Sequence, residues 1–163
     1  MVNGQGADGA DVYRGLREQI LGLDPAEAGI TAAPESGLWG GLMEMGLDNG
    51  TATLVALADG TTSLYFSTGG GVIGGGFRPP VAEATRSFLA SLDAHLADLV
   101  PDASAELPAA GRTALVALTR GGRLRAEAAE DDLGYGRHPL SPVFLAAHDV
   151  ITELRILQES RED

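Results

Sequence analysis

The chain of 163 residues contains no cysteine and no lysine, and each absence removes a class of chemistry. Without cysteine there is no disulfide, no thiolate metal site and no cysteine nucleophile. Without lysine there is no Schiff base and no Walker-type phosphate site. The basic side chains are 11 arginines. This bias, together with abundant Ala, Gly, Leu and Asp, is typical of a protein from a high-GC bacterium.

Positive charge is also scarce, since the formal net charge is -12. A surface of this kind repels phosphate backbones and anionic lipid head groups. We therefore expect neither nucleic acid nor a membrane surface as a partner. No apolar run is long enough to span a bilayer, and residues 1–10 have neither the basic nor the apolar region of a signal peptide. The sequence therefore predicts a cytoplasmic protein.

The apolar residues, 44% of the chain, follow periods that predict a single α+β domain over residues 11–163 after a disordered N-terminus over residues 1–10. The predicted helices cover residues 11–23, 81–99 and 142–158, and the predicted strands cover residues 38–47, 51–58, 61–67, 112–119 and 123–130. Short glycine-containing turns join the strands, as in antiparallel hairpins. We expect a two-layer fold with a five-stranded antiparallel sheet, helices mainly on one face, and the order α-β-β-β-α-β-β-α.

The two halves of the chain resemble each other. The sequence Leu-Val-Ala-Leu occurs at residues 54–57 and again at residues 115–118. A glycine follows three residues after each copy, and an amphipathic helix follows each hairpin. This pattern fits an internal duplication of a ββα unit, and it also fits a chance similarity of two amphipathic units.

The strands at 51–58 and 112–119 are apolar on both faces, and such strands need cover on both sides of a sheet. The two long helices cover one face. Either the first helix or a second subunit covers the other, and we expect a homodimer. A protein-binding or assembly module acting as a dimer is therefore the first functional hypothesis.

A glycine-rich segment over residues 69–76 includes the spacing G-x-G-x-x-G at residues 69–74. In a dinucleotide-binding fold this spacing lies directly between a parallel strand and a helix. Here it follows a hairpin, and Arg78-Pro79-Pro80 separates it from the helix. We favour a bent connection that needs positive φ angles over a nucleotide site.

A second hypothesis assigns ligand binding to the starts of the two long helices. Helix starts offer free amides, and arginine binds oxyanions through two parallel hydrogen bonds. If the two halves are pseudo-symmetric, the helix starts at Arg78 and Arg137 converge on one anion. In the alternative, the arginines pair with nearby acids such as Asp131 and Asp132. The predicted ligand-binding residues are Gly74, Gly75, Gly76, Arg78, Arg137 and His138.

Catalytic and metal chemistry have little support in the sequence. The histidines at 95, 138 and 148 are dispersed, so we expect no metal site, and no cofactor motif is present. Glu44 lies in an apolar strand, where it is either a buried acid/base or, by strand alternation, exposed to solvent. We favour a non-enzymatic protein. A small-ligand or anion-binding protein is the first alternative, and an enzyme of a type that the sequence does not reveal is the second.

Overall fold

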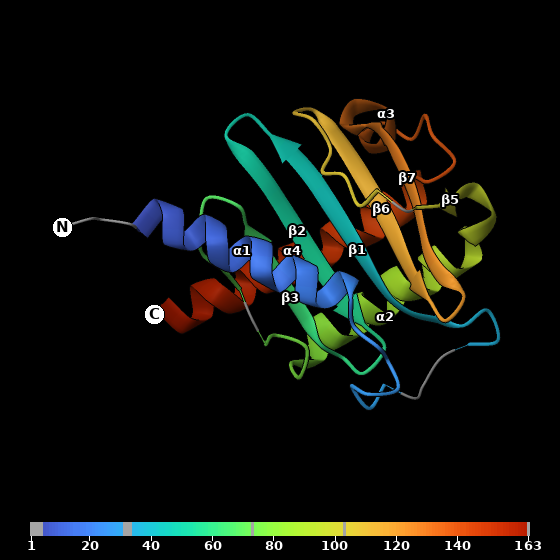
Figure 1. Ribbon diagram of the computed structural model, residues 1–163, viewed down its shortest axis with the longest axis horizontal. Helices are drawn as coiled ribbons and strands as arrows, with labels where there is room; N and C mark the ends of the chain where they lie inside the picture. Colours follow the sequence, from blue (N-terminus) through green and yellow to red (C-terminus); the bar gives the residue numbers. More distant parts are fainter. Residues whose placement is uncertain (1–4, 31–33, 73, 103, 163) are drawn as a thin grey trace.

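The structure is a computed structural model that describes residues 5–30, 34–72, 74–102 and 104–162 (Figure 1). The helices are α1 (Gln5–Leu21), α2 (Pro79–Ala94), α3 (Glu130–Gly134) and α4 (Ser141–Glu162), with a short 3-10 helix at Leu96–Asp98. The strands are β1 (Leu38–Leu47), β2 (Gly50–Leu57), β3 (Thr62–Phe66), β4 (Gly71–Val72), β5 (Val100–Pro101), β6 (Arg112–Thr119) and β7 (Gly122–Ala129).

In the described residues the strands form one seven-stranded antiparallel sheet with the order β4-β3-β2-β1-β6-β7-β5. Figure 1 shows α1 crossing one face of the sheet, while α2 and α4 lie on the other. The predicted α+β class and element order are confirmed. The sheet has seven strands instead of five, because the two-residue strands β4 and β5 extend its edges. Two residues are too few to produce an apolar period.

The N-terminal prediction needs a correction. The first helix begins at Gln5, so residues 5–10 of the segment predicted to be disordered are helical. Residues 1–4 lie outside the described residues. Among the helices that the structure describes, none combines the length and apolar character that a membrane span needs.

The main core lies between the sheet and the pair α2 and α4. Phe88 and Leu92 of α2 and Leu154 of α4 are fully buried in one apolar cluster with the sheet. Their spacing along each helix places them on one stripe, as the sequence predicts. Gly41 lets α2 lie close to the central strand, because a Cβ at this position would lie 2.5 Å from a methyl group of Leu92.

The opposite face of the sheet has a second apolar cluster. Ile20 and Leu21 of α1 pack near Leu42 and Val55 of the sheet in this cluster. Over β6 and β7 the segment that follows β5 adds cover, and its Glu106 carbonyl accepts a hydrogen bond from Arg125 Nη2 at 3.1 Å. The face whose exposure suggested a dimer therefore receives cover from its own chain, and the homodimer stays a prediction.

The topology contradicts an internal duplication. Strands β2 and β6 both pair antiparallel with β1 and so run parallel to each other. Their hairpin partners β3 and β7 lie on opposite sides in the sheet, whereas α2 and α4 lie on the same face. The two ββα units therefore share their strand direction and their helix face, but the second strand of each hairpin lies on the opposite side of the first. Such units are mirror images, and no rotation superimposes one on the other. The repeated Leu-Val-Ala-Leu reflects two strands that are buried on both faces.

Candidate functional site

The structure separates the two halves of the predicted anion site. Strand β4 turns back along β3, and Gly75 N–H donates to the carbonyl oxygen of Thr62 at 3.3 Å. Helix α2 therefore begins at the end of the sheet that holds the turn around Gly60. Strand β7 has no such return strand and leads into α3 and α4 at the opposite end, where Glu130 N–H donates to the carbonyl oxygen of Gly111 at 2.9 Å.

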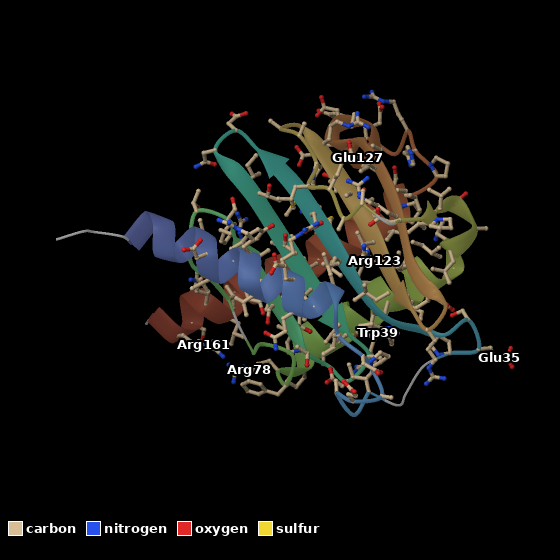
Figure 2. The ribbon with its side chains drawn as sticks, in the orientation of Figure 1. Glu35, Trp39, Arg78, Arg123, Glu127 and Arg161 are labelled. Atoms are coloured by element: carbon tan, nitrogen blue, oxygen red, sulfur yellow. The ribbon has the colours of Figure 1, made fainter. Side chains whose placement is uncertain are left out.

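As a result, Arg78 does not share a ligand with Arg137 and His138. Arg78 lines a small groove with Leu157 and Ser160 from the last turns of α4, and Figure 2 shows it near Arg161. Arg137 and His138 precede the first turn of the same helix. Sixteen residues of helix, or about 24 Å, separate the two ends. The two helix starts therefore do not converge on one anion, as the sequence hypothesis requires.

Arg137 and His138 also have structural roles in their own turn. The Nε of Arg137 lies 3.3 Å from Asp132 Oδ1, and its guanidinium lies 5.1 Å from the centre of the Tyr135 ring. This is the pairing with an acidic neighbour that the sequence offered as the alternative. His138 Nδ1 accepts a hydrogen bond from the backbone N–H of Leu140 at 3.0 Å.

The glycines before α2 are required by geometry. Gly74 has a φ of +75°, which side chains rarely adopt. A Cβ at Gly75 would lie 2.6 Å from a methyl group of Leu154, and one at Gly76 would lie 1.6 Å from the carbonyl oxygen of Gly60. This agrees with the bent connection that the sequence favoured.

Glu44 is buried and paired, an arrangement that neither sequence hypothesis included. It is 1% exposed. Its carboxylate accepts hydrogen bonds from Arg17 Nε at 2.7 Å, from Arg17 Nη2 at 2.9 Å and from Thr53 Oγ1 at 2.9 Å. The Tyr13 hydroxyl lies 2.6 Å from Thr53 Oγ1. The hydrogen bond with Glu44 raises the pKa of Arg17, and burial raises the pKa of Tyr13. The network fixes α1 on the sheet.

The histidines have packing roles. His148 lies against Phe144 with ring centres 4.4 Å apart. Burial lowers the pKa of His148, and its Nε2 has no hydrogen-bond partner among the described residues. His95 Nδ1 lies 2.7 Å from the carbonyl oxygen of Ser91. In the part of the chain that the structure describes, no group of three histidine or acidic side chains is arranged to hold a metal ion.

A cavity lies where α1 ends on the sheet. Its volume is about 570 Å³. The walls come from the end of α1 and its following turn, from β1, and from the turn between β6 and β7. Figure 2 shows Trp39 and Arg123, which line it from β1 and β7. The lining residues are Leu21, Leu23, Asp24, Pro25, Ala26, Ile30, Trp39, Leu118, Thr119, Arg120, Gly122 and Arg123.

The cavity combines an apolar wall with polar groups on one side. Trp39 is 5% exposed, and its Nε1 has no hydrogen-bond partner among the described residues. Arg123 Nε lies 3.3 Å from Asp102 Oδ2. Burial raises the pKa of Asp102, but hydrogen bonds from the backbone N–H groups of Ala105 and Ser104 and from Arg123 together hold it below its ordinary value. Arg123 thus faces a carboxylate that is ionised at neutral pH.

Sequence reasoning did not identify this cavity because its lining comes from three separate segments. The one local signal is Trp39, a large amphipathic side chain at the start of an apolar strand. Two glycines follow Trp39, and a Cβ at Gly40 would lie 2.7 Å from a methyl group of Leu57. That signal predicts close packing and does not reveal an adjacent space.

Comparison of the chain with protein-family models, with curated proteins and with solved structures finds no match.

Proposed function

We propose that the protein binds a small, largely apolar ligand in the cavity at the end of α1. An apolar space of about 570 Å³ supports this function. It lies beside the buried indole of Trp39, whose Nε1 has no hydrogen-bond partner among the described residues. Ligand cavities commonly have volumes of roughly 300–1,000 Å³, with mostly apolar walls and few polar groups. This takes up the small-ligand alternative from the sequence and moves its site to the opposite face of the sheet.

Hydrogen bonds within the protein hold the walls of this cavity in place. Asp24 Oδ1 accepts the backbone N–H of Ala26 at 2.9 Å. The carbonyl oxygen of Pro25 accepts the N–H of Ile30 at 2.8 Å. On the opposite side, the side-chain hydroxyl of Thr119 donates to the carbonyl oxygen of Gly122 at 2.7 Å. A pre-formed site loses less conformational entropy when it binds, which favours affinity.

The chain supplies its own reporter for ligand entry, because Trp39 is its only tryptophan. We expect the neutral dye N-phenyl-1-naphthylamine to bind saturably and to receive excitation energy from Trp39. Dye emission on excitation of tryptophan, titrated against protein concentration, measures this binding. An absence of saturable energy transfer would contradict the proposed function.

A matched pair of alanine substitutions tests whether the dye occupies this cavity. Ala26 lines the cavity and is exposed, whereas Ala28 is also exposed in the same turn but is not among the lining residues. Ala26→Phe should weaken dye binding by about tenfold or more, and Ala28→Phe should leave it unchanged. Equal effects of the two substitutions would place the dye elsewhere.

A protein-assembly function is the second candidate, in the form of the expected homodimer. Leu145 and Ile156 on α4 are 50% and 53% exposed. Their spacing of eleven residues places them on the same side of the helix, because eleven residues make about three turns. In a two-fold antiparallel pairing of α4 with its copy, Leu145 of one protomer would face Ile156 of the other.

Sedimentation equilibrium at micromolar concentration tests this assembly. We expect a dimer for the wild type and a monomer for the Leu145→Asp/Ile156→Asp double variant. The control is Leu107→Asp, since Leu107 is 44% exposed but lies outside α4. A wild-type monomer would contradict the candidate dimer. We also propose that the protein is cytoplasmic, as the sequence predicts.

A further inference from the structure

We infer that the ligand of the cavity at the end of α1 is an apolar carboxylate, with its hydrocarbon body against Leu21, Leu23 and Leu118 and its carboxylate on the side of Trp39 and Arg123. This inference rests on the proposed function and adds the chemical class of the ligand. Fatty acids of medium chain length and arylalkanoic acids are members of this class.

The charge of the cavity lining supports an anion. Arg120 and Arg123 line it together with one acidic residue, Asp24, in a chain of formal net charge -12. The Asp24 carboxylate accepts a backbone hydrogen bond in its own turn. Asp102 pairs with Arg123, so two arginines and two carboxylates leave the cavity close to neutral in a strongly negative chain. Anions are repelled by most of this surface, so the arginine side of the cavity is a selective location for them.

The hydrogen-bonding groups also fit a carboxylate. The Trp39 indole is a donor only, so a ligand that satisfies it must present an acceptor. Arg123 is oriented by Asp102 through Nε. A guanidinium has five N–H groups, and one held by a carboxylate through Nε can donate to a second acceptor through its Nη groups. A neutral acceptor would satisfy the indole, but only an anion gains from the arginines as well.

The apolar wall requires the rest of the ligand to be hydrophobic. Leu21, Leu23, Ile30 and Leu118 occupy the side of the cavity formed by α1, its following turn and β6. Inorganic phosphate or sulfate would leave this wall in contact with water and would gain nothing from it. A chain such as decanoate covers the wall and still presents two oxygen acceptors at one end.

A titration with three ligands of equal chain length tests the inference. Decanoate and decyltrimethylammonium are added below their micelle concentrations and decan-1-ol below its solubility limit, and the emission of Trp39 reports binding. We expect decanoate to bind about tenfold more tightly than decan-1-ol, and decyltrimethylammonium to bind most weakly. Arg120→Gln and Arg123→Gln should each reduce the advantage of decanoate over decan-1-ol.

The control for the loss of one positive charge is Arg86→Gln, because Arg86 is exposed on α2 on the other face of the sheet. This variant should retain the full preference for decanoate. Equal affinities for decanoate and decan-1-ol would overturn the carboxylate inference and leave the proposed function intact. Tightest binding of the cation would do the same. If none of the three ligands changes the Trp39 emission, both the inference and the proposed function fail.

Discussion

Arg17 on α1 and Glu44 on the central strand β1 form a bidentate ion pair at the surface of the sheet, with N–O distances of 2.7 and 2.9 Å. The Glu44 side chain is 1% exposed and that of Arg17 is 13% exposed. Arg17 Nη2 also donates to the carbonyl oxygen of Ala105 at 2.8 Å. One guanidinium therefore connects α1, the sheet and the segment that follows β5.

Removing one partner of this pair should destabilise the protein strongly. Glu44→Gln or Arg17→Met each leaves a buried group without its partner, at an expected cost of about 3 kcal/mol in the free energy of unfolding. The double variant Arg17→Met/Glu44→Met removes both charges, and we expect it to be more stable than either single variant. Urea denaturation followed by Trp39 fluorescence measures all three.

The exposed pair on the same helix is the control. Arg14 Nη2 lies 3.3 Å from Asp11 Oδ1, and both side chains are more than half exposed. Arg14→Met should change the free energy of unfolding by less than about 0.5 kcal/mol. A cost similar to that of Arg17→Met would show that burial does not determine the importance of these pairs.

The Tyr13 hydroxyl should contribute stability that disappears in alkali. Tyr13→Phe removes the hydrogen bond with Thr53 and should cost about 1 kcal/mol at neutral pH. Burial raises the pKa of Tyr13, so the unfolded chain loses this proton first as the pH rises. Wild-type stability therefore falls above about pH 10, and the difference from Tyr13→Phe should narrow. A constant difference from pH 7 to pH 11 would contradict this role.

His148 should make the protein sensitive to mild acid. Burial is the main cause that lowers the pKa of His148, with Arg155 adding to it and Glu130 and Asp149 opposing it. The unfolded chain therefore takes up the proton first, and stability falls as the pH drops below about 6.5. His148→Leu should lose less stability than the wild type between pH 7 and pH 5. Parallel stability curves would refute this effect.

Two glycine substitutions should have effects of opposite sign. Gly76→Ala places a Cβ 1.6 Å from the carbonyl oxygen of Gly60, so we expect a loss of about 2 kcal/mol or more. Gly15→Ala places a Cβ in open space within α1, so we expect a gain of about 0.5–1 kcal/mol from helix propensity. Thermal unfolding without any ligand measures both. A neutral Gly76→Ala would remove the steric explanation for this glycine.

Much of the fold could be predicted because most of its elements are long enough to show a period. Strands β1 and β6 have the predicted bounds, and the predicted helices occur, with shifted ends. The prediction failed where a two-residue strand decides the path of the chain. Strand β4 shows no period, but its return along β3 sends Arg78 and Arg137 to opposite ends of the molecule.

The candidate site could not be predicted, because tertiary packing determines it. The sequence allows Glu44 to be either exposed or a buried acid/base, but its environment depends on Arg17, which lies 27 residues away on a helix that crosses the sheet. Likewise Trp39 and Arg123 line one cavity only after β1, β6 and β7 are placed in order. Sequence periodicity gives the face of a side chain within its own element, and it does not give the neighbours across elements.

Strands β4 and β5 lie at the two edges of the sheet and have two residues each. The second residue of β5 is Pro101. An extended chain that approached β4 or β5 would meet a very short row of backbone donors and acceptors, and at Pro101 the donor is missing. Pairing of a second copy of the protein along β4 or β5 is therefore limited to a few backbone hydrogen bonds.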